Sequence, residues 1–98
     1  MFARLTIIQV KIDRIDDASK LFEESVVPMF KSQKGYQGGY FLADRKTGKC
    51  ICISLWESEE DVVANEQSRS YQEQLIKFME FFTAQQPIRE GYEVTVQD

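Results

Sequence analysis

Four residues of this sequence have side chains that suit a small-molecule pocket: Tyr40, Trp56, Asn65 and Tyr71. Tyrosine and tryptophan combine apolar contact with one polar group, and asparagine contributes an amide; ligand pockets are lined by such groups. Asn65 follows two valines and can face inward, where its amide needs hydrogen-bond partners. In a second interpretation, the three aromatic residues fill a core between helices and sheet, with their polar tips near water. The sequence leaves both interpretations open.

The chain contains no histidine, which excludes much enzyme chemistry. A Ser-His or Cys-His nucleophile pair is impossible, and so is a zinc or haem site with a histidine ligand. Two cysteines alone do not complete a structural zinc site. The acidic run that comprises Glu57, Glu59, Glu60 and Asp61 is better explained as a helix start than as a metal site. We therefore expect neither a metal nor a cofactor.

The length of 98 residues predicts one domain over residues 1–98. With 12 basic and 16 acidic residues, the formal net charge is −4, which argues against nucleic acid or an anionic membrane as a partner. No apolar run approaches the roughly 18 residues of a membrane span, and the start lacks a signal-like apolar core. We expect a cytoplasmic protein with Cys50 and Cys52 as reduced thiols on one strand face.

The centre of the chain predicts a β-hairpin with arms at 36–44 and 49–57. The link between the arms is polar and ends in Gly48, which can adopt a positive φ at little cost. Alternation and β-branched residues predict two further strands, at 3–12 and at 92–97. The chain therefore carries four strands, two of them joined directly.

Helices are predicted between these strands. Apolar residues at three- and four-residue spacing predict a helix over 16–32, with a kink or break just before Pro28 because proline removes a backbone donor. Capping boxes that begin at Ser58 and Ser70 predict two more helices, and Pro87 ends the second of them.

The element order is β-α-β-β-α-β, which is the ferredoxin-like pattern of the α+β class. Its four strands form an antiparallel sheet, and the helices pack on one face of that sheet. Every strand but the last carries apolar residues on both faces, so the face without helices needs a cover. The simplest cover is a second copy of the chain, which predicts a homodimer packed sheet against sheet.

Several short segments carry a resemblance to a known family. They are Val27-Pro28, Gly35-Tyr36, Gly38-Gly39-Tyr40 and Leu55-Trp56-Glu57-Ser58. In these segments and in element order, nearly the whole chain resembles the antibiotic biosynthesis monooxygenase (ABM) superfamily of dimeric α+β barrels. The superfamily includes cofactor-free monooxygenases of polyphenolic or quinol substrates, haem-degrading enzymes and proteins of unassigned activity, so the resemblance implies a fold more strongly than a reaction.

The haem-degrading branch of that superfamily uses a helix histidine on iron, a nearby tryptophan and an N-terminal asparagine. In an ungapped comparison, the histidine position falls at Leu75, the tryptophan position at Asn65, and the N-terminal strand offers Gln9. These departures argue against haem degradation, and the missing histidine also argues against histidine-dependent quinol oxidation.

The resemblance then implies a cofactor-independent monooxygenase whose aromatic substrate, as an anion, itself gives electrons to oxygen. In that case Asn65 donates to the substrate oxyanion, Tyr71 or Tyr40 orients it, and Trp56 forms a pocket wall. Two alternatives stay open: a non-catalytic protein that binds a small aromatic ligand in the same cavity, and an interaction module whose dimer face is its function.

Overall fold

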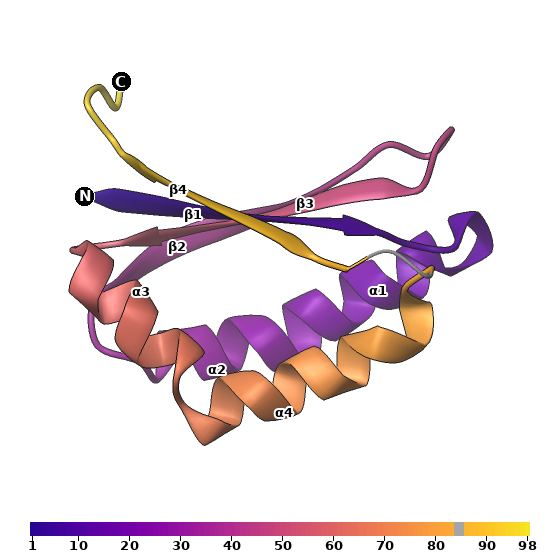
Figure 1. Cartoon of the computed structure of the whole chain (residues 1–98), viewed down its shortest axis with the longest axis horizontal. Coiled ribbons are helices and arrows are strands. Elements are labelled where there is room, and N and C mark those ends of the chain that lie inside the picture. The colour runs from indigo at the N-terminus through magenta and orange to yellow at the C-terminus, as the bar shows by residue number, and fades with distance from the viewer. Residues whose placement is uncertain (84–85) are drawn as a thin grey trace.

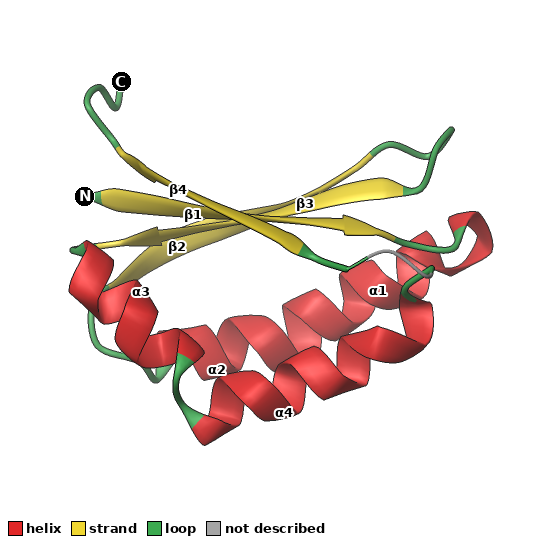
Figure 2. Ribbon diagram, in the orientation of Figure 1, coloured by secondary structure: helices red, strands yellow, loops and turns green. Residues whose placement is uncertain are grey.

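The computed structural model describes residues 1–83 and 86–98, and its element order is the predicted β-α-β-β-α-β. An antiparallel sheet has the strand order β2-β3-β1-β4, and the helices lie on one of its faces (Figures 1 and 2). The four strands are β1 (Phe2–Gln9), β2 (Tyr36–Ala43), β3 (Lys49–Trp56) and β4 (Ile88–Glu93). The α+β, ferredoxin-like prediction is confirmed.

The first helical region contains a π-helical segment next to Pro28. A short 3-10 turn (Ile12–Arg14) leads into α1 (Ile15–Leu21), the π-helical segment (Phe22–Val26) and α2 (Val27–Lys31). The backbone N–H of Val27 donates to the carbonyl of Phe22, one residue further back than in an α-helix. Because Pro28 has no N–H and its ring crowds the preceding turn, the extra residue relieves the clash without ending the helix. The predicted kink is thus a bulge.

The second helical region is split at Ser68. Helix α3 (Glu59–Glu66) begins at Ser58, whose hydroxyl accepts from the backbone N–H of Asp61 at 3.2 Å, as predicted. Helix α4 (Arg69–Phe78) is capped by Ser68 and not by Ser70, which corrects the prediction. Ser68 accepts from the N–H of Tyr71 at 3.2 Å and donates to the carbonyl of Asn65 at 2.7 Å, so one side chain ends α3 and starts α4.

Two boundaries differ from the sequence prediction near the C-terminus. A 3-10 turn (Met79–Phe81) ends the last helix before Pro87, and part of the predicted extension, residues 84–85, lies outside the described residues. Strand β4 runs from Ile88 to Glu93 and not from 92 to 97. Glu93 pairs with Phe2, the first residue of β1, and the N–H of Val94 donates to the carbonyl of Met1 at 2.9 Å.

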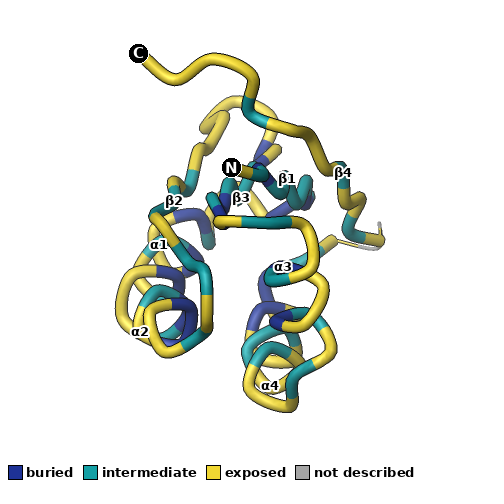
Figure 3. The backbone as a smooth tube through the Cα atoms, turned by 90° about the vertical axis from the view of Figure 1, so that its left-hand side faces the viewer, coloured by how far each residue is buried: buried dark blue, intermediate teal, exposed yellow. Residues whose placement is uncertain are grey.

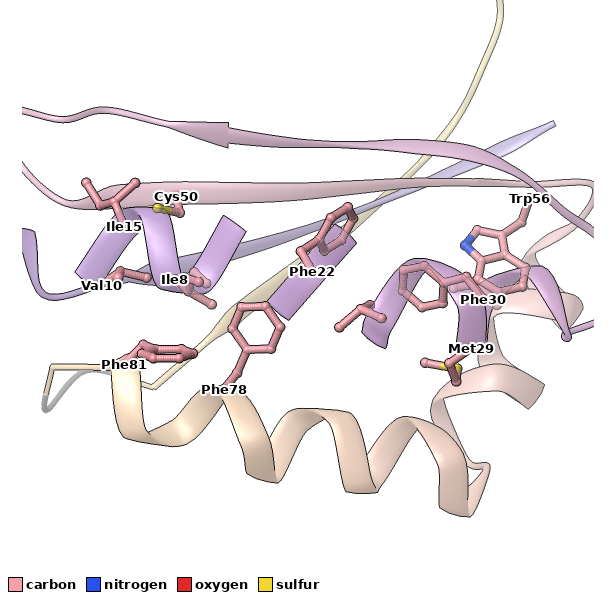
Figure 4. Packing of buried hydrophobic residues seen from close by; sticks show 13 residues of the cluster. Ile8, Val10, Ile15, Phe22, Met29, Phe30, Cys50, Trp56, Phe78 and Phe81 are labelled. Atoms are coloured by element: carbon pink, nitrogen blue, oxygen red, sulfur yellow. The ribbon is translucent and has the colours of Figure 1, made fainter. Parts of the chain in front are cut away.

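The core lies between the helices and one face of the sheet. Figure 4 shows Trp56 pointing from β3 onto Phe30, while Phe78 and Phe81 rise from the last helical region. The rings of Phe30 and Trp56 meet edge to face with centroids 5.7 Å apart, a favourable geometry for buried aromatic residues. The view of Figure 3, turned by 90°, shows α1 with α2 and α3 with α4 as two groups beneath the sheet.

The opposite face of the sheet is apolar, and no described helix lies on it. Strand register places its side chains in rows across the sheet. The apolar members of these rows are Leu42, Ile51, Ile7, Ile88, Tyr40, Ile53, Leu5, Leu55, Ala3 and Tyr92. Tyr40 and Ile88 leave 60% and 58% of their surface exposed, large values for such side chains. No helix of the described residues is long and apolar enough to cross a membrane.

We predict that Gly48→Ala destabilises the fold more than Gly38→Ala does. Both glycines have a positive φ (80° and 140°), so both substitutions strain the backbone. A Cβ on Gly48 overlaps the carbonyl oxygen of Val10, whereas one on Gly38 meets nothing within 4 Å. Thermal and denaturant unfolding should show an additional loss of about 1–3 kcal/mol for Gly48→Ala. Equal losses for the two variants contradict this account of the hairpin link.

Candidate functional site

A cavity lies between the sheet and the helices, with about 60 Å³ accessible to the centre of a water molecule. Roughly 10–15 Å³ of such space holds one water, so the cavity can admit more than one or part of a small ligand. Its apolar walls include Ile8, Phe22, Val26, Phe30, Phe41, Val62, Leu75 and Phe78. Its polar groups come from Arg4, Thr6, Ser54, Asn65, Glu66, Tyr71 and Gln74.

Small side chains on the sheet leave this space open. The helix-facing residues at its centre are Cys52 and Ser54 on β3 and Thr6 on β1, none of which is long enough to reach the helices. Larger aromatic side chains hold the helices away on either side. Phe22, in the π-helical segment, packs on Phe41 with ring centroids 5.2 Å apart, and both rings line the cavity. The cavity is therefore a consequence of side-chain volumes along neighbouring strands.

Asn65 is the most unusual residue of the cavity. It lies on the face of α3 that also presents Val62, three residues earlier, and only 2% of its surface is exposed. Its carboxamide oxygen Oδ1 is buried and has no hydrogen-bond partner among the described residues. An unsatisfied buried polar group costs about 1–3 kcal/mol, so this arrangement suggests a ligand or water that completes the bond.

A buried ion pair lies beside Asn65. Arg4, from β1, places Nη2 3.1 Å from Oε1 of Glu66 and Nε 3.0 Å from Oε2. Both side chains are largely buried, with 16% and 10% exposed, and Arg89 from β4 approaches the same carboxylate at 3.7 Å. The sequence interpretation missed this pair. Its available signal was Arg4 itself, a charged residue on a strand face otherwise shared with Thr6 and aliphatic residues.

Tyr71 reaches the cavity from the first turn of α4. Burial raises the pKa of its hydroxyl, which therefore stays protonated at neutral pH and can donate or accept a hydrogen bond. The guanidinium of Arg89 lies 5.4 Å from the centre of its ring, a cation–π distance.

Neither Trp56, predicted as a pocket wall, nor Tyr40, predicted to orient the substrate, lines the cavity. Trp56 is fully buried in the core and does not line the cavity, although its indole N–H donates to Oγ of Ser54, which does, at 2.9 Å. Tyr40 lies on the apolar face without helices, beside Ile53. The structure therefore does not bring Tyr40 and Asn65 together, because a bulge between Tyr36 and Gly38 shifts the register of β2 and turns Tyr40 to the face opposite that of Tyr36.

The remaining reactive side chain of the cavity is Cys52. Cys52 lines the cavity, but its thiol is largely enclosed by neighbouring residues. This burial raises the pKa of the thiol to about 12. The thiol is therefore protonated at neutral pH and is a poor nucleophile. Cys50 is buried, and both cysteines are free. Within the described ranges 1–83 and 86–98, no three His, Cys, Asp or Glu residues are grouped to hold a metal ion.

Comparison of sequences places the chain near proteins without an assigned activity. No family model matches it. It is 34% identical over 65 residues to the uncharacterized proteins Rv2557 and MT2634 of two Mycobacterium tuberculosis strains. The match covers 66% of this chain but 29% of each relative, so the chain spans less than a third of the curated relatives' length.

Solved structures give a much fuller match. A candidate antibiotic biosynthesis monooxygenase from Bordetella bronchiseptica superimposes with a TM-score of 0.84 over 97% of both chains, at 20% identity. SnoaB, a cofactor-independent oxygenase from Streptomyces nogalater whose structure is that of an asparagine-to-alanine variant, gives 0.77 over 98% of this chain and 94% of its own, at 10% identity. Over nearly its full length, therefore, this chain has the α+β ferredoxin-like fold of the antibiotic biosynthesis monooxygenases.

Proposed function

We propose that the protein is a cofactor-independent monooxygenase that oxidises a small aromatic substrate of the quinol type in this cavity. The observation that carries the proposal is the buried carboxamide of Asn65, whose Oδ1 has no hydrogen-bond partner among the described residues and which lines a cavity with mainly apolar walls. Apart from that amide, the ion pair, Tyr71 and the side chains of Thr6, Ser54 and Gln74, the walls are apolar and exclude water. The fold that the chain shares with a cofactor-independent oxygenase adds support.

The proposed reaction needs no cofactor because the substrate supplies all four electrons that reduce O₂. The substrate phenolate transfers one electron to O₂, and the resulting aryl radical and superoxide combine to form a C–O bond. The peroxide then loses water from its C–H and O–OH groups, which leaves a carbonyl. One oxygen atom enters the ring as a quinone oxygen, and the other leaves as water.

The residues of the cavity have simple roles in this reaction. The carboxamide N–H of Asn65 donates to the oxyanion, and the apolar walls exclude water, which strengthens that interaction. The hydroxyl of Tyr71, protonated at neutral pH, orients the substrate oxygen. Trp56 acts indirectly: its indole N–H donates to the Ser54 hydroxyl and so orients a group that lines the cavity.

A binding protein without turnover is the second candidate function. It is favoured by the lack of an evident proton acceptor among the described residues of the cavity. The thiol of Cys52 and the hydroxyl of Tyr71 are both protonated at neutral pH, and Glu66 is engaged by two guanidinium groups. Such a protein holds a phenol or quinol in the same position, and oxygen consumption distinguishes the two functions.

Asn65→Leu tests the proposal by separating stability from function. Leucine fills a similar volume without a buried amide, so the melting temperature should stay equal or rise, by an amount corresponding to about 1–3 kcal/mol at most. Loss of a hydrogen bond to a charged oxygen should lower kcat/KM about ten- to hundred-fold. The assay is oxygen uptake with a panel of naphthols, anthrones and quinols.

Gln67→Leu is the matched control, because it removes an exposed amide from the residue that directly follows α3, two positions after Asn65. It should change neither melting nor oxygen uptake. If no compound of the panel supports uptake by the unmodified protein, but several bind saturably, the protein is a binding protein. If Asn65→Leu lowers stability and oxygen uptake by equivalent free energies, Asn65 has a purely structural role and is not part of the site.

We propose also that the active form is a homodimer joined through the apolar sheet face. Ile53 and Leu5 lie side by side at the middle of this face, with Tyr40 and Leu42 on the neighbouring strand. A two-fold dimer brings the same surface of each copy together, so an apolar face packs against an identical apolar face. Glu90 is a charged residue at the rim of the face, as expected for an edge that keeps contact with water.

Ile53→Lys should convert this dimer into a monomer. An unpaired charge at the centre of an apolar interface is strongly unfavourable, so sedimentation at micromolar concentration should change from dimer to monomer. Val63→Lys, which places the same charge on an exposed valine of α3, should leave the dimer intact. A stable monomer for the unmodified protein at micromolar concentration refutes the proposed assembly.

A further inference from the structure

The polar end of the cavity contains one buried guanidinium, that of Arg4. Two guanidinium groups, those of Arg4 and Arg89, approach the single carboxylate of Glu66. Tyr71 and Cys52, on the cavity wall, are protonated at neutral pH and carry no charge. Arg89 is 39% exposed and does not line the cavity, so the guanidinium that borders this poorly hydrated space is that of Arg4, and a charge acts more strongly there than in water.

Arg4 also has a donor without an acceptor. Its Nε lies 3.0 Å from Oε2 of Glu66, an ion-pair distance, yet its N–H is not directed at that oxygen and makes no hydrogen bond to any described residue. The cavity thus has two buried polar atoms without a partner, Nε of Arg4, a donor, and Oδ1 of Asn65, an acceptor. A ligand that satisfies both must offer an acceptor to the first and a donor to the second.

The neighbouring strands leave space for the Arg4 guanidinium. Arg4 lies in a cross-strand row between Ser54 and Gly91. A Cβ on Gly91 would lie 2.9 Å from Nη1 of Arg4 and 2.6 Å from the ring of Phe2, so only glycine leaves room for the side chain in its present position. The carboxylate of Glu66 holds the guanidinium from the helix side. Glu66 therefore holds the Arg4 guanidinium on the helix side, and Gly91 leaves space for it on the sheet.

We propose that Arg4 is the anion-binding residue of the cavity and that Glu66 positions it, which selects an aromatic substrate in singly ionised form with a hydroxyl next to the ionised oxygen. This inference rests on the function proposed above and narrows its substrate class. Nε of Arg4 and the amide N–H of Asn65 donate to the phenolate oxygen, and Oδ1 of Asn65 accepts from the adjacent hydroxyl. Ionisation at this oxygen is the state from which electrons pass to O₂.

The test uses three probes that need no turnover: 4-nitrocatechol, 4-nitrophenol and 4-nitroanisole. The first two ionise near neutral pH with a visible colour change, and the third is a neutral ether of similar shape. We expect affinity to fall in that order. We also expect both phenols to bind as phenolates, so that bound probe shows phenolate absorbance at a pH where free probe is mostly protonated.

Arg4→Gln should lower the affinity for 4-nitrophenol about ten- to hundred-fold, the effect of losing a charged hydrogen bond, and leave 4-nitroanisole unchanged. Because this variant leaves Glu66 buried beside a weaker partner, the double variant Arg4→Gln/Glu66→Gln provides a neutral pair of similar shape. It should fold and show the same loss of phenolate preference. Arg14→Gln is the matched control, since Arg14 also pairs with a carboxylate and covers an aromatic ring, but at the surface.

The possible outcomes separate the two proposals. If phenolate preference depends on Arg4 while no quinol supports oxygen uptake, the anion site stands and the oxygenase proposal fails. If oxygen uptake occurs but the double variant keeps the phenolate preference, the anion site is refuted and the oxygenase proposal stands. Equal affinity of the unmodified protein for 4-nitrophenol and 4-nitroanisole also refutes the anion site, as does an equal loss of both probes in the folded double variant.

Discussion

The central constraint on this structure is the burial of an amide, that of Asn65, whose oxygen has no hydrogen-bond partner within residues 1–83 and 86–98. Helix α3 places Asn65 beside Val62 against the sheet, and the small side chains of Cys52, Ser54 and Thr6 keep the opposite wall out of reach. A core that was selected only for stability fills such a space with aliphatic side chains, which removes both the cavity and the unpaired oxygen. Here the aromatic packing of Phe22 and its neighbours holds the space open instead.

The break between α3 and α4 lies just after Asn65. Asn65 lies at the end of α3, and its backbone carbonyl accepts from the hydroxyl of Ser68, which also caps α4. The chain therefore turns directly after the amide, and the new helix brings Tyr71 to the same cavity. On the other side, the π-helical segment before Pro28 places Phe22 and Val26 along the cavity wall. Local helix irregularities are thus concentrated around the site.

Patterns of local chemistry predicted much of this fold. The polar link ending in Gly48 located the hairpin, the Ser58 box located the start of α3, and apolar periodicity located the first helical region. The capping of α4 was misplaced because Ser68 and Ser70 offer the same chemistry two residues apart, and only packing selects between them. The last strand was misplaced because its bounds depend on its partner β1, which local sequence does not reveal.

The candidate site was harder to predict for the same reason. Asn65 and Tyr71 reach the cavity from positions that helical geometry allows, but Tyr40 required knowledge of strand register, and its face was assigned wrongly. Arg4 and Glu66 are 62 residues apart, and their pairing follows from tertiary packing alone. Even so, a charged residue on an apolar strand face is a signal of a buried partner, because an unpaired charge is very costly there.

The most direct test of the account is an NMR titration of the ¹⁵N-labelled protein that follows the side-chain NH₂ of Asn65, with 4-nitrocatechol as the ligand. We predict that this NH₂ resonance shifts saturably, together with backbone signals of α3, the start of α4 and the centre of β3, while the exposed amide of Gln67 stays unchanged. Shifts confined to the apolar face around Tyr40 and Ile53, with no change at Asn65, would contradict the assignment of the cavity as the functional site.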